Sequence, residues 1–131
     1  MKIQDAHKGI LEMFDLHVKS FSFEREKLID NSELEISLDY KMEERSDKEA
    51  EFELSMSLNN KQNQFRLSIS VVATMEKNEV SPNWNSLQSN GFAIISPFLR
   101  SQISILTAQP NFTPIVLPVF NFNKIIENQE D

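Results

Sequence analysis

The sequence predicts an α+β domain in which one long apolar helix packs on a sheet of four antiparallel strands. Apolar and polar residues alternate in four stretches between residues 10 and 75, as expected for half-buried strands. A later stretch, 91–109, instead repeats its apolar residues at steps of three and four, which is helical spacing. A chain of 131 residues is expected to form a single domain over 1–131.

The first strand is predicted to start at Ile10 and to change phase part-way along. Its apolar side chains fall first on even positions and then on odd positions: Ile10, Phe14, Leu16 and Val18, followed by Phe21 and Phe23. One extra residue near Lys19 and Ser20 would produce this change, and such an insertion is a β-bulge. The alternative is that two separate short strands meet there.

Three further strands are predicted from strict alternation. Their apolar faces are Leu34, Ile36, Leu38, Tyr40 and Met42, then Phe52, Leu54, Met56 and Leu58, then Phe65, Leu67, Ile69, Val71, Ala73 and Met75. The residues between them are mostly charged or carry hydroxyl groups, so one face of the sheet is expected to be buried and the other solvated. Polar turns at 43–48 and 59–64 predict an antiparallel meander.

The helix predicted over 91–109 has more apolar surface than a sheet can cover. Beside its main stripe of Phe92, Ile95, Leu99, Ile103 and Leu106 runs a second stripe of Ile94, Phe98 and Ile105. We expect this second stripe, at Phe98 and Ile105, to form an oligomer interface or, less often, an exposed apolar groove. Pro97 has two interpretations: it follows an N-cap at Ser96, or it kinks a longer helix that begins near Pro82.

The chain after this helix is predicted to be extended. Prolines at 110, 114 and 118 exclude a central strand and favour extended or edge structure over 109–122. A last short helical turn is expected over 123–128, with Ile125 and Ile126 as its apolar residues.

Composition narrows the functional classes. The net charge is −7, which disfavours nucleic acid and anionic membrane surfaces as partners because both are negatively charged. The chain has no cysteine, so disulfides and thiolate chemistry are excluded. We find neither a signal-peptide pattern nor an apolar run of membrane-spanning length, so the expected localisation is cytoplasmic, with no membrane span.

Residues that carry chemistry are scarce, so no catalytic residue is predicted and the protein is not expected to be an enzyme. The two histidines, His7 and His17, are isolated, and no G-x-S-x-G motif accompanies them. No metal site is predicted, because ligands with the spacing of a zinc or calcium site are absent. The two isolated glycines, Gly9 and Gly91, do not form a phosphate-binding loop, and no cofactor is expected.

The polar face of the predicted sheet carries many carboxylates. They share one face because they alternate with apolar residues: Glu33, Glu35, Asp39, Glu43, Glu51 and Glu53. The simpler interpretation is that they solvate this face. The alternative is that they form an electronegative platform for a basic partner.

Two motifs late in the chain resemble those of the SecB family of export chaperones. Residues 96–100, Ser-Pro-Phe-Leu-Arg, stand where that family has an F-P-Y-x-R type helix. Residues 118–122, Pro-Val-Phe-Asn-Phe, correspond to its closing P-x-N-F segment, and Ser22-Phe23-Glu24 resembles its S-F-E. The resemblance covers roughly residues 10–127, with its specific part in 96–122.

The resemblance implies two helices on one face of a four-stranded antiparallel sheet, assembled as a dimer of dimers, that is, a tetramer. It also implies a chaperone that holds unfolded polypeptides in apolar grooves without nucleotide, for protein translocation or, in some members, for one antitoxin. Glu24 would belong to an acidic surface that docks the SecA motor, together with Glu35, Asp39 and Glu53. The fourth strand departs from the family, because it carries Arg66 and two serines where acidic residues are expected.

Candidate client-binding residues are apolar side chains without an obvious place in the sheet core. They are Leu28, Ile29, Trp84, Leu87, Phe92 and Phe112. The alternative is that these side chains cap the ends of the core. At the level of function, a SecB-like holdase competes with an oligomeric adaptor that has no chaperone activity, and an apolar groove left exposed in the assembled oligomer would favour the holdase.

Overall fold

The computed structural model describes residues 11–26, 34–60, 65–79, 82–110, 112 and 114–130. The strands are β1 (Leu11–Arg25), β2 (Leu34–Glu44), β3 (Glu49–Asn60) and β4 (Phe65–Lys77). They are followed by a 3-10 helix η2 (Trp84–Leu87), the long helix α2 (Gln88–Leu106) and the short helix α3 (Phe122–Glu130). This is the predicted arrangement of four antiparallel strands and two helices.

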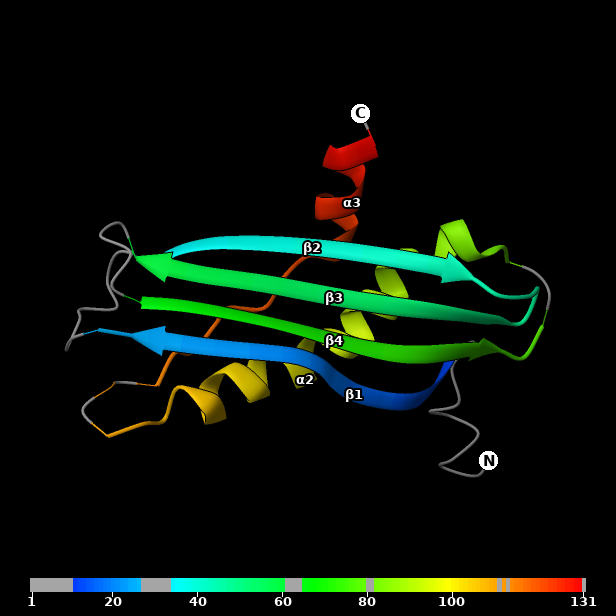
Figure 1. Cartoon of the computed structure of the whole chain (residues 1–131). Coiled ribbons are helices and arrows are strands. Elements are labelled where there is room, and N and C mark those ends of the chain that lie inside the picture. Colours follow the sequence, from blue (N-terminus) through cyan, green and yellow to red (C-terminus); the bar gives the residue numbers. More distant parts are fainter. Residues whose placement is uncertain are drawn as a thin grey trace, which may run out of the picture.

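The four strands form one antiparallel sheet in the order β1-β4-β3-β2. Only β2, β3 and β4 form a meander, because β1 pairs with β4 at the far edge of the sheet. Strands β1 and β2, which are consecutive in the sequence, therefore lie at opposite edges of the sheet. In Figure 1, α2 crosses behind the sheet and α3 extends beyond the β2 edge, so none of the described helices lies on the opposite face of the sheet. We call this opposite surface the open face.

The core forms between the sheet and the helices. Alternate residues of β3 and β4 are buried, from Phe52 to Leu58 and from Phe65 to Met75, as their alternation predicts. The helices contribute Phe92, Ile95, Leu99, Ile103, Phe122 and Ile126 to the same core. The edge strands are covered less completely: Ile36 of β2 pairs with buried Leu58, yet it is 48% exposed.

Strand β1 contains two irregularities where the sequence predicts one. The predicted bulge is confirmed, because the pairing with β4 shifts by one residue between Val18 and Ser20. A second shift lies between Phe14 and His17, and Asp15 there adopts a φ of 52°. Because of the shift between Phe14 and His17, Phe14 lies on the open face. Its predicted place on the apolar face with Leu16 is therefore wrong. Sequence alone was ambiguous here because residues of both parities are apolar before Leu16.

Helix α2 continues through Pro97, which confirms the interpretation as a longer helix that begins before this residue. It starts at Gln88, directly after η2, rather than at Ser96. The helix also passes very close to β3 at Gly91. A Cβ atom at this position would lie 2.2 Å from Cε2 of the Phe52 ring, so only glycine fits there.

The segment 114–121 is extended, as predicted, and runs back along α2. Ser104 Oγ donates a hydrogen bond to the Ile115 carbonyl oxygen at 2.8 Å, and the Ile115 N–H donates to Thr107 Oγ1 at 2.8 Å. The buried side chains of Ile115 and Leu117 hold the segment against the core. It leads into α3, which is longer than the predicted 123–128 and is anchored by Phe122 and Ile126.

Candidate functional site

The largest exposed apolar side chains of the helix layer lie along α2 and the extended segment. Ile94 is 41% exposed, Ile105 62%, Val116 83% and Val119 78%. We call these four residues the apolar strip. Ile94 and Ile105 come from the second apolar stripe of α2. In the extended segment, Val116 lies between buried Ile115 and Leu117, and Val119 follows Pro118. Exposed apolar side chains of this kind are candidates for an interaction surface.

Two open pockets lie between α2 and the extended segment, each of about 370 Å³. One lies beside the first half of α2 and is lined by Ala93, Val119, Phe120 and neighbouring polar residues. The other lies beside the second half and is lined by Arg100, Ile105, Val116 and neighbouring residues. Three of the four residues of the apolar strip therefore line a pocket.

The backbone of the extended segment is as available as its side chains. The last hydrogen bonds that hold it are made by Ile115, and the next backbone bond along the chain joins the Ile125 N–H to the Asn121 oxygen. Within the part of the chain that the structure describes, residues 116–120 form no hydrogen bond. This stretch thus presents unpaired backbone N–H and C=O groups beside Val116 and Val119.

Four of the predicted client-binding residues are instead part of the core: Trp84, Leu87, Phe92 and Phe112 are all buried. The Trp84 Nε1–H donates to the Ser46 carbonyl oxygen at 3.0 Å, and the Phe112 ring stacks on Phe65 with centroids 5.2 Å apart. The premise that these side chains have no place in the core is wrong, because β-strand partners far away in sequence cover them. In this conformation they expose almost no surface to a client. Leu28 and Ile29 lie outside the described residues.

The predicted interface residues of α2 differ in exposure. Ile105 is largely exposed, whereas Phe98 is half-buried and packs against the core. An oligomer interface at these two residues stays a prediction. Sequence reasoning did not single out Val116 and Val119. The proline-interrupted apolar run 109–122 was the available signal, because prolines prevent such a run from joining the sheet.

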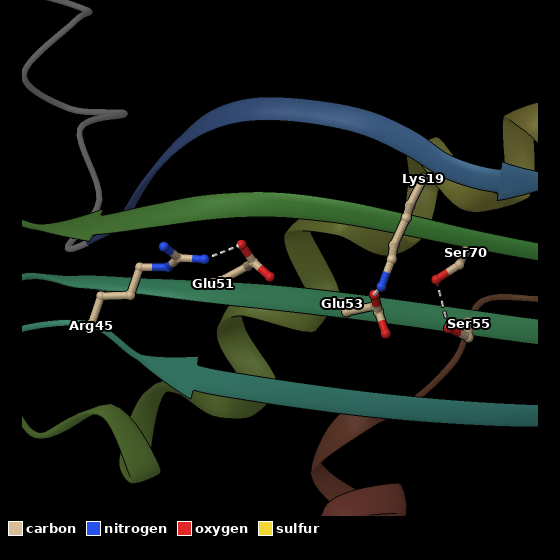
Figure 2. Close-up of polar contacts among 6 residues, drawn as sticks. All are labelled: Lys19, Arg45, Glu51, Glu53, Ser55 and Ser70. Atoms are coloured by element: carbon tan, nitrogen blue, oxygen red, sulfur yellow. Dashed lines mark hydrogen bonds and ion pairs between the residues drawn. The ribbon is translucent and has the colours of Figure 1, made fainter.

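The open face carries five of the six predicted carboxylates: Glu35, Asp39, Glu43, Glu51 and Glu53. Glu33 lies outside the described residues. Some of the carboxylates on this face have basic partners there. Lys19 Nζ lies 2.7 Å from Glu53 Oε1, and Arg66 pairs with Glu24 at 3.0 Å. Figure 2 shows the Lys19 pair, together with an ion pair between Arg45 and Glu51, in front of the strands. Hydrogen bonding to Glu53 and its charge raise the pKa of Lys19 above its ordinary value.

Hydroxyl groups fill most of the centre of the open face. The pairing places Ser22, Ser68, Ser57 and Ser37 in one row across all four strands. The next row is Ser20, Ser70, Ser55 and Asp39, in which the hydroxyls of Ser55 and Ser70 are 2.8 Å apart. Glu35 and Asp39 lie on this face at the β2 edge, where no ion pair is seen among the described residues. A partner site at Glu24, Glu35, Asp39 and Glu53 stays a prediction.

Within the described ranges, no three histidine or acidic side chains come together as a metal site. None of the helices described is both long enough and apolar enough to cross a bilayer.

The fold has a close counterpart among solved structures. It is similar to the SecB-like chaperone Rv1957 of Mycobacterium tuberculosis, solved in complex with a ChAD peptide from the HigA1 antitoxin Rv1956. The TM-score is 0.69 over 84% of this chain and 87% of the other, with 11% sequence identity. This chain has a SecB-like fold.

Other comparisons add little to the SecB-like assignment. A protein of unknown function from Streptococcus agalactiae is similar at a TM-score of 0.47, with 13% identity over 82% of this chain and 96% of the other. The sequence matches no protein-family model and no curated protein. The SecB-like assignment therefore rests on the arrangement of strands and helices, since the two sequences are only 11% identical.

Proposed function

We propose that this protein is a SecB-like molecular chaperone that holds an unfolded polypeptide client on the apolar strip. The observation that carries the proposal is the exposure of Ile94, Ile105, Val116 and Val119 on the helix layer of a SecB-like fold. Holding a client in this way is a binding function, so it requires no catalytic residue.

The geometry of the extended segment suits a client without fixed structure. An unfolded chain offers apolar side chains and unpaired backbone groups at the same time. The extended segment offers matching groups of both kinds. Val116 and Val119 expose apolar side chains, and the backbone groups of 116–120 form no hydrogen bond with the described residues. An extended peptide can add to such a segment as a strand adds to a sheet edge.

We favour a dedicated client over general export. The solved counterpart binds a peptide from an antitoxin, which is an example of one specific client on this fold. Docking of an export motor through the open face has less support, since Glu24 and Glu53 already have basic partners there. Such docking would also weaken as salt rises, because exposed charges are screened.

The proposal includes assembly into a homo-oligomer, a dimer of dimers, in the cytoplasm. Part of the exposed face of α2, at Phe98 and Ile105, would form contacts between copies. Val116 and Val119, which belong to the extended segment, would remain exposed to the client. The client surface and the assembly surface would then lie side by side on the helix layer.

The test is suppression of aggregation of a chemically denatured protein on dilution. The parent chain should suppress aggregation without ATP, and a Val116→Ser, Val119→Ser double variant should lose most of this activity. A control is Phe14→Ser, which removes a partly exposed apolar side chain (43%) from the open face. This control should suppress aggregation as well as the parent.

The competing function is an oligomeric adaptor without chaperone activity. It predicts that the apolar strip is fully covered by other copies of the chain. In that case the parent should fail to protect any unfolded protein, including peptides rich in aliphatic residues. The double variant should then change the oligomeric state and nothing else.

A further inference from the structure

Acidic residues are distributed unevenly along this chain. Of the 20 Asp and Glu residues, 17 lie before residue 80 and the other three lie after residue 126. The stretch 82–126, which includes η2, α2, the extended segment and the first part of α3, contains no acid and has Arg100 and Lys124 as its basic residues. The last part of α3 adds Glu127 and Glu130, so the local excess of positive charge is limited to 82–126.

Arg100 is the single charged residue of α2, and it forms no ion pair with any residue that the structure describes. Its Nε is buried and has no hydrogen-bond partner among those residues. By contrast, Lys19, Arg45 and Arg66, which lie in the strands or directly after one, all pair with glutamates. Burying a guanidinium donor without a partner is unfavourable, so a partner from outside this chain would stabilise the arrangement.

The surroundings of Arg100 indicate the chemistry of that partner. Arg100 lines the second pocket with the hydroxyl-bearing residues Ser101 and Ser104, while Ile105, Val116 and Leu117 provide its aliphatic part. A guanidinium flanked by hydroxyls matches a carboxylate, which can accept two parallel hydrogen bonds from arginine. The aliphatic part matches neighbouring apolar side chains of the same partner. The volume of the second pocket, about 370 Å³, is within the range of small binding sites.

We infer that the Arg100 pocket selects client segments in which an acidic side chain, Asp or Glu, stands among aliphatic residues. This inference rests on the proposed client-binding function and defines its specificity. The absence of acidic residues from α2 and from 107–126 favours such a segment over a basic one, and the apolar strip favours it over a purely polar acidic one. Arg100 would anchor the register of the client, while Val116, which the proposed assembly leaves exposed, contacts its aliphatic side chains.

The experiment measures binding of short fluorescent peptides by anisotropy. Two peptides, acetylated and amidated, are identical except for a central Glu or Gln among leucines and valines. The parent chain should bind the Glu peptide about tenfold more tightly, because a charge-assisted hydrogen bond to arginine is stronger than a neutral one. This preference should shrink as salt is raised. A third peptide has Gln in the centre and a free C-terminus. It tests whether the carboxylate that Arg100 binds is a chain terminus rather than an acidic side chain.

Variants assign the preference to Arg100. Arg100→Gln should bind the Glu and Gln peptides with equal affinity, while Arg100→Lys should retain part of the preference for the Glu peptide. Arg66→Gln is the matched control, since Arg66 lies on the open face and pairs with Glu24. This control should keep the full preference. Both Arg100 variants should stay folded, because they remove a buried donor that has no partner.

The outcomes separate this inference from the proposed function. If the parent binds the Glu and Gln peptides equally, the selectivity is wrong and the chaperone function stands. Tighter binding of the free C-terminus than of the Glu side chain also overturns the inference. A change of oligomeric state in Arg100→Gln, with the peptide preference intact, would place a second copy of the chain on Arg100 and overturn it as well. If the parent binds no peptide and suppresses no aggregation, the proposed function itself fails.

Discussion

Replacing Gly91 by alanine tests how closely α2 packs on β3. The added Cβ would lie 2.2, 2.7 and 2.8 Å from three atoms of the Phe52 ring. That ring is fully buried and is held between Phe92, at a centroid distance of 5.0 Å, and Trp84, at 6.0 Å. It therefore cannot swing away, and either α2 must shift or its side chains must leave their preferred rotamers.

Two opposing terms set the size of the effect. Overpacking a core of this kind costs up to about 3 kcal/mol, and three contacts below 3.0 Å indicate the upper end. Alanine is a better helix former than glycine by about 1 kcal/mol, which offsets part of this cost. We expect Gly91→Ala to lower the free energy of unfolding by about 2 kcal/mol, or roughly 30-fold in the folding equilibrium.

Urea unfolding at fixed protein concentration measures this change, and the fluorescence of the single tryptophan, Trp84, reports it. Asn90→Ala, at the exposed neighbouring position of α2, is the control and should stabilise the protein by a few tenths of a kcal/mol. Combining Gly91→Ala with Phe52→Leu should recover part of the loss, since the smaller side chain removes the clash. A Gly91→Ala protein as stable as the parent would refute the close approach of α2 to β3.

Three further predictions concern assembly, ionisation and the core. Ile105→Asp should lower the sedimentation coefficient, because a charge in the apolar interface would dissociate the oligomer. Ser57→Asp on the open face is the control and should leave the sedimentation coefficient unchanged. A parent that is monomeric at micromolar concentration would contradict the proposed assembly. Because Glu53 raises the pKa of Lys19, the attraction between the two side chains is present below the ordinary lysine pKa and disappears only as pH rises through the raised value. Glu53→Gln should return the pKa of Lys19, measured by NMR, toward its ordinary value. An unchanged pKa in this variant would exclude the ion pair in solution. Trp84→Ala should lower stability by about 3 to 5 kcal/mol in urea unfolding followed by circular dichroism, as for a buried core aromatic, and a loss below about 1 kcal/mol would show that Trp84 is not core.

Sequence patterns were sufficient for features that depend on local periodicity. The alternation in β3 and β4 identified their buried faces, because every second side chain of a strand points to the same side. The phase change at Lys19 identified a real bulge. The second apolar stripe of α2 correctly indicated that Ile105 would remain largely uncovered within one copy of the chain.

Tertiary structure decided which segments meet, and periodicity carries no information about this. Nothing in the sequence shows that β1 pairs with β4 rather than β2, because hydrogen bonds between strands are made by the backbone and do not depend on side-chain identity. Phe112 became a core residue only because Phe23 and Phe65, far away in sequence, come to lie beside it. The isolation of Arg100 was likewise invisible in the sequence, because it depends on a fold in which none of the described acidic residues forms an ion pair with Arg100.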